Sequence, residues 1–161
     1  MSEFEDKITI DRIDRKILRI LQDDGRITNT ALAKAVGLSP TPCLERVKKL
    51  EKLGVIEGYT AKINPDKLGS PLLVFVEITL SRTSTDSFAD FSEAAQKTDE
   101  VLECHLVSGD FDFLLKARVA DMAAYRKLLG ETILNMPGVN ESRTYVVMEA
   151  VKQGNKVVIR N

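Results

Sequence analysis

The sequence lacks most of the residues with which proteins build metal centres, disulfide frameworks and catalytic sites. In 161 residues it has no tryptophan, one histidine and two cysteines. Cys43 and Cys104 lie far apart, which suggests neither a metal-ligand spacing nor a disulfide framework. His105 has no cluster of cysteines or carboxylates beside it, so we interpret it as structural. There is also no glycine-rich phosphate loop and no triad pattern. We therefore expect no enzyme, no metal and no cofactor.

Long apolar segments are missing as well. No run of about 18 apolar residues, the length that suggests a membrane helix, occurs in the sequence. The first residues do not have the basic and apolar regions of a signal peptide. We therefore expect a cytoplasmic protein without a membrane partner, and the length suits one domain or two small ones.

The formal net charge of −1 is small for a protein that binds nucleic acid, but the charges are unevenly distributed. Between Arg26 and Lys62 there are seven Lys and Arg against three Asp and Glu. From Asn64 to the end there are eleven against fourteen. A basic patch on one module matters more for DNA binding than the total charge does. The distribution therefore predicts two modules with different functions.

Residues 28–53 have the pattern of two helices joined by a tight turn. Thr28 is a good N-cap for a short helix over residues 29–36, and Gly37 provides the left-handed conformation that ends it. Ser39 is suited to cap the next helix, with Pro40 at its first position. With a preceding helix from Ile10-Asp11 to Asp23, the pattern predicts a three-helix, winged-helix-like helix-turn-helix unit.

The second helix of this pair is the expected recognition helix. Leu44, Val47 and Leu50 are expected to be buried, so the short and basic residues of the other face would enter a major groove. The expected DNA-binding residues of this helix and its surroundings are Arg26, Ser39, Thr41, Cys43, Arg46, Lys48, Lys49 and Lys52. Two alternatives remain: an ordinary helical hairpin, and a surface ion pair between Glu45 and Lys49 that would keep Lys49 from reading bases.

Turn-forming residues divide the chain. Residues 55–63 suggest a short extended segment of the kind that forms a small wing, and two breaks follow at Asn64-Pro65 and Gly69-Ser70-Pro71. We therefore place a DNA-binding domain at residues 1–59, a linker at 60–71 and a second domain at 72–161.

The second domain alternates between strand and helix patterns. Strands are expected at residues 72–80, 101–107, 111–119 and 141–151, and helices at 84–97 and from Asp121 to Pro137. The order βαββαβ is that of a ferredoxin-like module, in which both helices cover one face of an antiparallel sheet. The whole chain is therefore expected to be an α+β protein.

Apolar residues occur on both faces of this expected sheet. Val74, Val76 and Ile78 are sufficient to meet the helices, yet Leu73 and Phe75 lie on the opposite face. Helices on one side cannot cover the other, so a second copy of the sheet is the simplest cover. The alternative is a lone domain with some exposed apolar residues.

Taken together, these features resemble the Lrp/AsnC family of transcription regulators. The resemblance covers about residues 10–159. The strings that carry it are DRIDR (residues 11–15), GLSPTPCLERV (37–47), ECHLVSGDFD (103–112) and YRKLLGET (125–132). It implies that the second domain is an amino-acid-sensing RAM domain, that RAM sheets form homodimers which assemble into octamers, and that an amino acid binds between RAM domains. The implied location is the cytoplasm, in association with the nucleoid.

The loop at residues 108–112 is the centre of the expected effector site. Glycine allows close approach of a backbone, and the Asp112 carboxylate can accept hydrogen bonds from an α-ammonium group. From the residues alone, a polar hairpin turn is the simpler interpretation; the family resemblance favours the site. The expected effector-binding residues are Leu106, Gly109, Asp110, Asp112, Met122, Tyr145, Val146 and Val147. The apolar members suit a branched side chain such as that of leucine.

The expected function is therefore sequence-specific, amino-acid-responsive binding of double-stranded DNA to regulate genes of amino-acid metabolism. The alternative is a RAM-type amino-acid sensor that acts mainly through protein partners. Only the helix-turn-helix pattern distinguishes the two, so a gel shift with the upstream region of the chain's own gene would separate them.

Overall fold

The structure, a computed structural model, describes residues 9–81, 84–154 and 156–160. The chain divides into two compact units, residues 1–62 with 153–161 and residues 63–152. The last nine residues thus group with the first unit, although the sequence suggested that they belong to the second. None of the helices in the described residues has the length and apolarity needed to cross a membrane.

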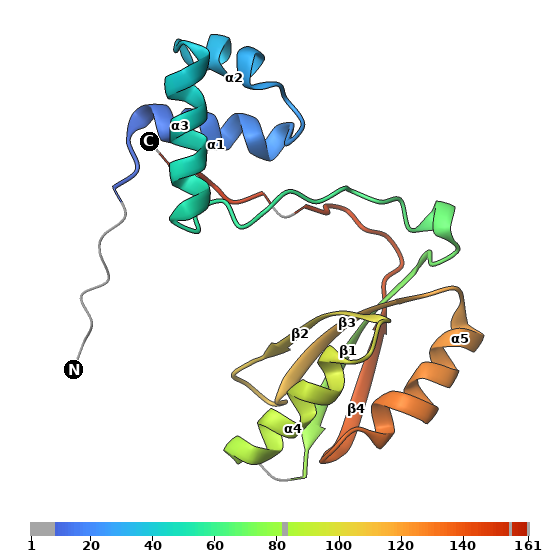
Figure 1. The fold of residues 1–161 in the computed structure, drawn as a ribbon. Coiled ribbons are helices and arrows are strands. Elements are labelled where there is room, and N and C mark those ends of the chain that lie inside the picture. Colours follow the sequence, from blue (N-terminus) through green and yellow to red (C-terminus); the bar gives the residue numbers. More distant parts are fainter. Residues whose placement is uncertain (1–8, 82–83, 155, 161) are drawn as a thin grey trace, which may run out of the picture. The chain divides into compact units, whose positions relative to one another are not determined.

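The first unit contains three helices around one small core (Figure 1). They are α1 (Arg12–Asp23), α2 (Asn29–Val36) and α3 (Pro40–Lys52). The buried apolar residues are Ile17, Leu32, Ala33, Val36, Cys43, Val47 and Leu50. Each helix contributes at least one of them, so the unit has a core of its own.

Local side-chain and turn chemistry determines where these helices begin and end. Thr28 accepts a hydrogen bond from the Ala31 N–H, which caps α2 at 3.2 Å. Gly37 ends α2 with a φ of +79°, a conformation that favours glycine. The Asn29 side-chain amide donates to the carbonyl of Pro40 at 2.8 Å, which ties the start of α2 to the start of α3.

The buried face of α3 differs from the expected one by one position. Leu44 was expected in the core and is 40% exposed, whereas Cys43 is fully buried. The real stripe is Cys43, Val47 and Leu50, at spacings of four and three, which keeps its members on one side of a helix. Residues 57–64 form neither helix nor strand, so the expected extended segment does not become a paired wing.

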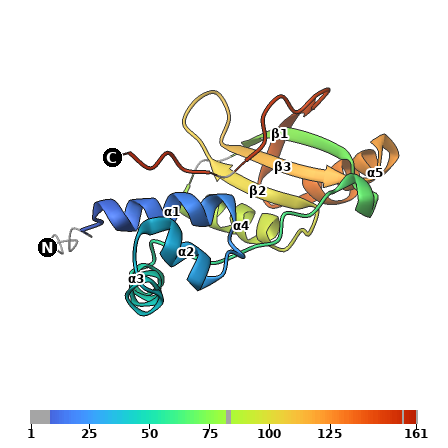
Figure 2. The same ribbon diagram turned by 90° about the horizontal axis from the view of Figure 1, so that it is seen from above.

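The second unit is a four-stranded antiparallel sheet with both of its α-helices on one face (Figure 1 and Figure 2). Its strand order is β2-β3-β1-β4. The strands are β1 (Leu72–Leu80), β2 (Val101–Leu106), β3 (Phe113–Val119) and β4 (Val139–Val146). The helices are α4 (Thr85–Gln96) and α5 (Met122–Lys127), and a short 3-10 turn (Asp66–Leu68) precedes β1.

Alternation of buried and partly exposed residues along β3 and most of β1 places the core between sheet and helices. In β3, Phe113, Leu115, Ala117 and Val119 are buried while the residues between them are partly exposed. Phe91 of α4 packs on Phe113 with ring centroids 4.5 Å apart. Tyr125 of α5 lies in the same core, and its hydroxyl bonds the Thr144 hydroxyl of β4.

The last helix and the last strand of this unit end several residues earlier than the sequence indicated. The expected single helix from Asp121 to Pro137 is regular only to Lys127, and it continues as a π turn (Leu128–Thr132) and a 3-10 turn (Ile133–Asn135). The last strand ends at Val146 rather than at residue 151.

The C-terminal segment of the chain binds the first helix instead of extending the sheet. Gln22 accepts a hydrogen bond from the Val157 N–H at 2.7 Å and donates one to the Val157 carbonyl at 3.1 Å. The Arg19 guanidinium donates to the Ile159 carbonyl at 2.8 Å. Lys156 forms an ion pair with Asp23. These contacts make residues 156–159 part of the first unit.

Candidate DNA-binding face and ligand site

The exposed face of α3 carries a row of lysines. Thr41, Lys48, Lys49 and Lys52 are all exposed, on the side away from the buried stripe of Cys43, Val47 and Leu50. Within the described part of the chain, the three lysines make no ion pair. The pair between Glu45 and Lys49, considered as an alternative, is therefore not formed. We call Thr41, Lys48, Lys49 and Lys52 the lysine face. Its charges are available to the phosphates of a nucleic acid.

Two other expected contacts, Arg26 and Ser39, are exposed. Ser39 is the residue directly before α3, and Arg26 lies before α2. Cys43 is not exposed. Its side chain lies in the three-helix core, where burial raises the pKa of the thiol. The prediction that Cys43 faces the groove is therefore wrong, because its position belongs to the buried stripe.

Arg46 lies between the lysine face and the core, and its charge is used within the unit. Its Nη1 is 2.5 Å from Asp11 Oδ2 and 2.7 Å from Asp14 Oδ1. Asp14 is only 4% exposed. The Asp14 N–H, followed by the Arg46 guanidinium, lowers the pKa of the Asp11 carboxyl. Hydrogen bonds to Asp11 and then Asp14 raise the pKa of Arg46. This arrangement turns Arg46 towards α1 instead of leaving it on the exposed lysine face.

The sequence suggested no role for Asp14, which is the one buried charged residue among those described. The sequence did contain a signal that relates Asp14 to Asp11. Asp11 and Asp14 have the spacing of a capping box, and in the structure each side chain accepts from the backbone N–H of the other.

The expected effector residues fall into two groups in one chain. The first group lies where β2 meets β3: Leu106 ends β2 opposite Phe113, and Gly109 and Asp110 occupy the connecting loop. Gly109 has a φ of +144°, which a residue with a side chain rarely adopts. Leu106 is 58% exposed, so an apolar side chain at this end is open to a ligand or to another chain.

Asp112, the expected partner of an α-ammonium group, already has a role within the chain. Its Oδ2 accepts a hydrogen bond from the Leu80 N–H at 2.7 Å, and its own N–H donates to the Ile78 carbonyl at 2.9 Å. These bonds tie the loop to the end of β1.

The second group lies at the opposite end and the opposite edge of the sheet. Met122 begins α5, just after β3, while Tyr145 and Val146 end β4. All three side chains are more than two-fifths exposed. The length of β3, seven residues, puts the two ends about 20 Å apart, and β2 and β4 are the two edges of the sheet. One chain therefore does not bring the two groups together.

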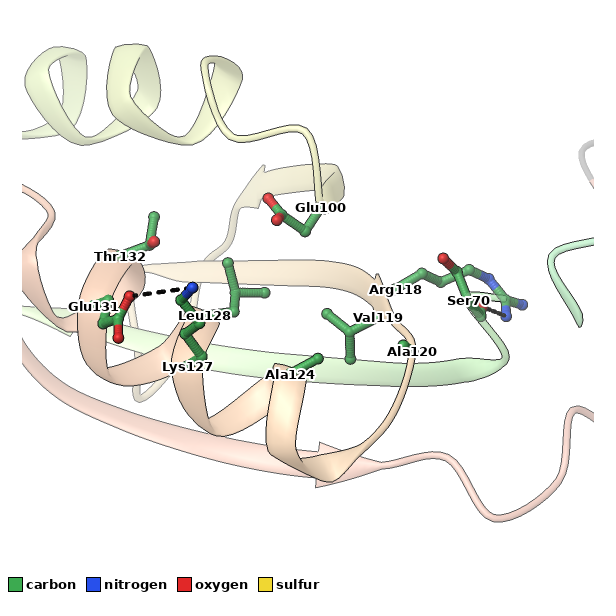
Figure 3. Close-up of a pocket in the computed structure, with 10 residues that line it drawn as sticks. All are labelled: Ser70, Glu100, Arg118, Val119, Ala120, Ala124, Lys127, Leu128, Glu131 and Thr132. Carbon is green, nitrogen blue, oxygen red and sulfur yellow. Dashed lines mark hydrogen bonds and ion pairs between the residues drawn. The ribbon is translucent and has the colours of Figure 1, made fainter. Parts of the chain in front are cut away.

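A separate hollow of about 340 Å³ lies beside α5. Figure 3 shows Glu100, on the connection before β2, across from Lys127 and Glu131, which point towards each other. Arg118, at the other side, donates to the Pro71 carbonyl at 3.1 Å. The hollow has charges of both signs, but none of the expected effector residues lines it.

The face of the sheet opposite the helices remains uncovered in one chain. Its middle is apolar, with Phe75 and Leu114 partly buried and Tyr145 45% exposed. Charged pairs surround this apolar middle. Lys116 Nζ lies 2.6 Å from Glu103 Oε1, and Arg143 Nη1 lies 3.9 Å from Glu77 Oε2. Leu73, which is buried, Thr79 and His105 lie on the same side of β1 and β2. We call this surface the open sheet face.

Both units match models of known protein families. Residues 10–57 match a model described as winged helix-turn-helix DNA-binding. Residues 73–157 match a model described as the Lrp/AsnC ligand binding domain. The two matches cover the lysine face, the open sheet face and both groups of expected effector residues.

Individual proteins are similar over nearly the whole chain. Leucine-responsive regulatory proteins of Klebsiella pneumoniae and Escherichia coli K12 are each 66% identical over 151 residues, 94% of this chain and 92% of the relative. Among solved structures, a transcriptional regulator of Neisseria meningitidis in complex with L-Met has a TM-score of 0.89 at 35% identity, covering 93% of this chain and 97% of that one. Escherichia coli AsnC has a TM-score of 0.84 at 26% identity, covering 92% and 98%.

Proposed function

The chain belongs to the Lrp/AsnC family of DNA-binding transcription regulators, and from this premise we propose that leucine regulates its action on genes of amino-acid metabolism. The DNA-binding helix-turn-helix and the ligand-binding domain are properties of the family, which is not one of enzymes. Leucine is the finer proposal. Its main support is the 66% identity to relatives named for their response to leucine. A regulator of this kind works where the genome is, so we also propose a cytoplasmic, nucleoid-associated location.

The lysine face supplies the first test. Replacing Lys49 by glutamine should lower the affinity for duplex DNA and reduce the slope of log K against log salt by about 0.9, because one phosphate loses its cation. Gel shifts or fluorescence anisotropy on the upstream region of the chain's own gene, at several salt concentrations, measure both. Lys97→Gln is the matched control, since Lys97 is an exposed lysine of α4 that pairs with Glu93. An unchanged slope for Lys49→Gln would remove Lys49 from the DNA contacts.

We propose that the effector site is completed between two chains. The two groups of effector residues lie at opposite corners of one sheet, so a small ligand such as leucine spans them only if each group comes from a different copy. The loop with Gly109 and Asp112 would hold the polar end of the amino acid. Met122, Tyr145, Val146 and Val147 of another copy would surround its side chain. The open sheet face supports homodimers, and assembly into octamers is the further arrangement that we propose on the family resemblance.

This arrangement predicts complementation between two defective variants. Asp112→Asn keeps an oxygen for the Leu80 N–H but removes the charge, so leucine affinity should fall about ten- to hundredfold. Met122→Ala should also weaken binding, through lost apolar contact. In a mixed dimer, the Met122→Ala chain supplies an intact loop and the Asp112→Asn chain supplies an intact Met122. One of its sites is then unaltered, and calorimetry should detect sites of wild-type affinity. Unmixing and remixing the subunits under mild denaturant precedes the titration.

The hollow beside α5 provides the control for this experiment. Glu131→Gln should leave leucine affinity unchanged if the site lies where we propose. If Glu131→Gln weakens binding while the other two variants do not, leucine binds in the hollow. If the mixture shows no wild-type sites although both single variants are weak, the site lies within one chain.

A further inference from the structure

Arg46 connects the recognition helix α3 to the first helix α1 at two points. Both contacts are made by one nitrogen, Nη1, with Asp11 on one side and Asp14 on the other. Asp11 is the N-cap of α1, and Asp14 is the third residue of that helix. The two carboxylates are themselves oriented, because each accepts a hydrogen bond from the backbone N–H of the other residue. Arg46 therefore binds a preformed pair of acceptors.

Asp14 makes it costly for Arg46 to leave. Its side chain is 6% exposed, and Oδ1 is the atom that Arg46 contacts, while Oδ2 accepts from the Asp11 N–H. Removing one partner of a buried ion pair leaves an uncompensated charge in a low-dielectric environment, which is strongly unfavourable. A move of the guanidinium towards a phosphate would leave Asp14 in that state. The charge of Arg46 is thus neutralised by ion pairs within the protein.

The contact also determines how α3 is turned about its axis. The buried stripe of Cys43, Val47 and Leu50 attaches the helix to the core, but apolar packing is non-directional. Ion pairs from Arg46 to two oriented carboxylates are directional, and they lie on the side between the core and the lysine face. A rotation of α3 would move the lysine face relative to α1 and would break these bonds.

We propose that Arg46 is a positioning residue that aligns the recognition helix for specific DNA through Asp11 and Asp14, and that it does not neutralise a phosphate. Loss of alignment lowers the affinity for the cognate sequence, where side chains must meet particular base edges. It hardly changes binding to random sequence, which depends on phosphate charge. A direct phosphate contact would weaken both kinds of binding and reduce the salt slope.

The test measures affinity for the upstream region of the chain's own gene and for a random duplex, over a range of salt concentrations. Arg46→Gln should lower affinity for the upstream DNA about tenfold or more, with little change on the random duplex and an unchanged salt slope. Asp14→Asn and Asp11→Asn should reproduce this loss, although each removes a negative charge. Arg46→Gln combined with Asp14→Asn should be little worse than Arg46→Gln alone, because both break one interaction.

Several outcomes would overturn the proposal. If Arg46 contacts DNA directly, Arg46→Gln reduces the salt slope by about 0.9, as Lys49→Gln does, and Arg46→Lys restores binding fully. In that case Asp11→Asn and Asp14→Asn raise the affinity, because they release the arginine. If Arg46 only stabilises the fold, the variants bind upstream DNA like the wild type at a temperature where circular dichroism shows them folded. Asp11 is 47% exposed, so Asp11→Asn is the variant expected to stay folded in every case.

Discussion

A fragment of residues 63–152 is expected to lose specific DNA binding completely while it stays folded and oligomeric. The fragment contains the whole sheet, both covering helices and the core between them. It lacks the lysine face. It also has fourteen Asp and Glu against nine Lys and Arg, and this net negative charge repels phosphate. Specific sites are typically bound about 10³-fold or more tightly than random DNA, so at least this preference should disappear. Gel shifts with the upstream region measure the loss.

The boundaries of this fragment follow from the structure. A cut that kept residues 153–161 would leave a segment whose partners on α1, Arg19 and Gln22, are gone. Sedimentation or light scattering of the fragment tests the second half of the prediction. A well-folded fragment that is monomeric at all concentrations would exclude the open sheet face as a dimer interface. If the fragment still bound the upstream region specifically, DNA recognition would lie in the second unit and not in the first.

Replacing Leu114 by lysine is expected to convert the protein to monomers at concentrations where the wild type is oligomeric. Leu114 lies in the middle of the open sheet face, opposite Glu77 of β1 in the sheet register. In a single chain, the new ammonium group reaches water and the Glu77 carboxylate, so the fold tolerates it. In a dimer it would be buried between two sheets. Burying a charge there should raise the dissociation constant about 30-fold or more, as loss of an interface hot spot of about 2 kcal/mol does.

Leu134→Lys is the matched control. Leu134 is 46% exposed, and it belongs to the 3-10 turn that follows α5, on the helix-covered side of the sheet. Both variants add one charge, but only Leu114→Lys should change the sedimentation profile. DNA affinity of Leu114→Lys should also fall, because two recognition helices are no longer joined in one oligomer that binds bivalently. Equal oligomeric states for wild type and Leu114→Lys, with circular dichroism unchanged, would contradict the proposed interface.

Local features of the fold were predictable from the sequence because their causes are local. Thr28, Gly37 and Pro40 mark the ends of two helices by capping and turn chemistry, and the structure has α2 and α3 at the expected positions. The alternating residues of β1 predicted that strand from Leu72 to Leu80, as found. The strand and helix order of the second unit was also recoverable, since each element has its own periodicity.

Features that depend on distant residues were not predictable in the same way. Spacing alone allowed either Cys43 or Leu44 to begin the buried stripe of α3, and packing against the other helices decided for Cys43. The sequence did not indicate the ion pairs of Arg46, because its partners, Asp11 and Asp14, lie more than thirty residues earlier. For the effector site, motif resemblance suggested candidate residues, but it did not show that one chain separates Leu106 from Tyr145 across the sheet.

The contact between Arg19 and Ile159 joins residues that are 140 positions apart, and this imposes an order on the synthesis of the molecule. At about 5–20 residues per second, α1 leaves the ribosome roughly 7 to 28 s before the segment that binds it. The strands and helices of the second unit are made entirely within this interval. A nascent chain therefore has all the elements of its ligand-binding unit before its DNA-binding unit receives the last segment. In each new molecule the first unit is therefore begun before the second and completed after it.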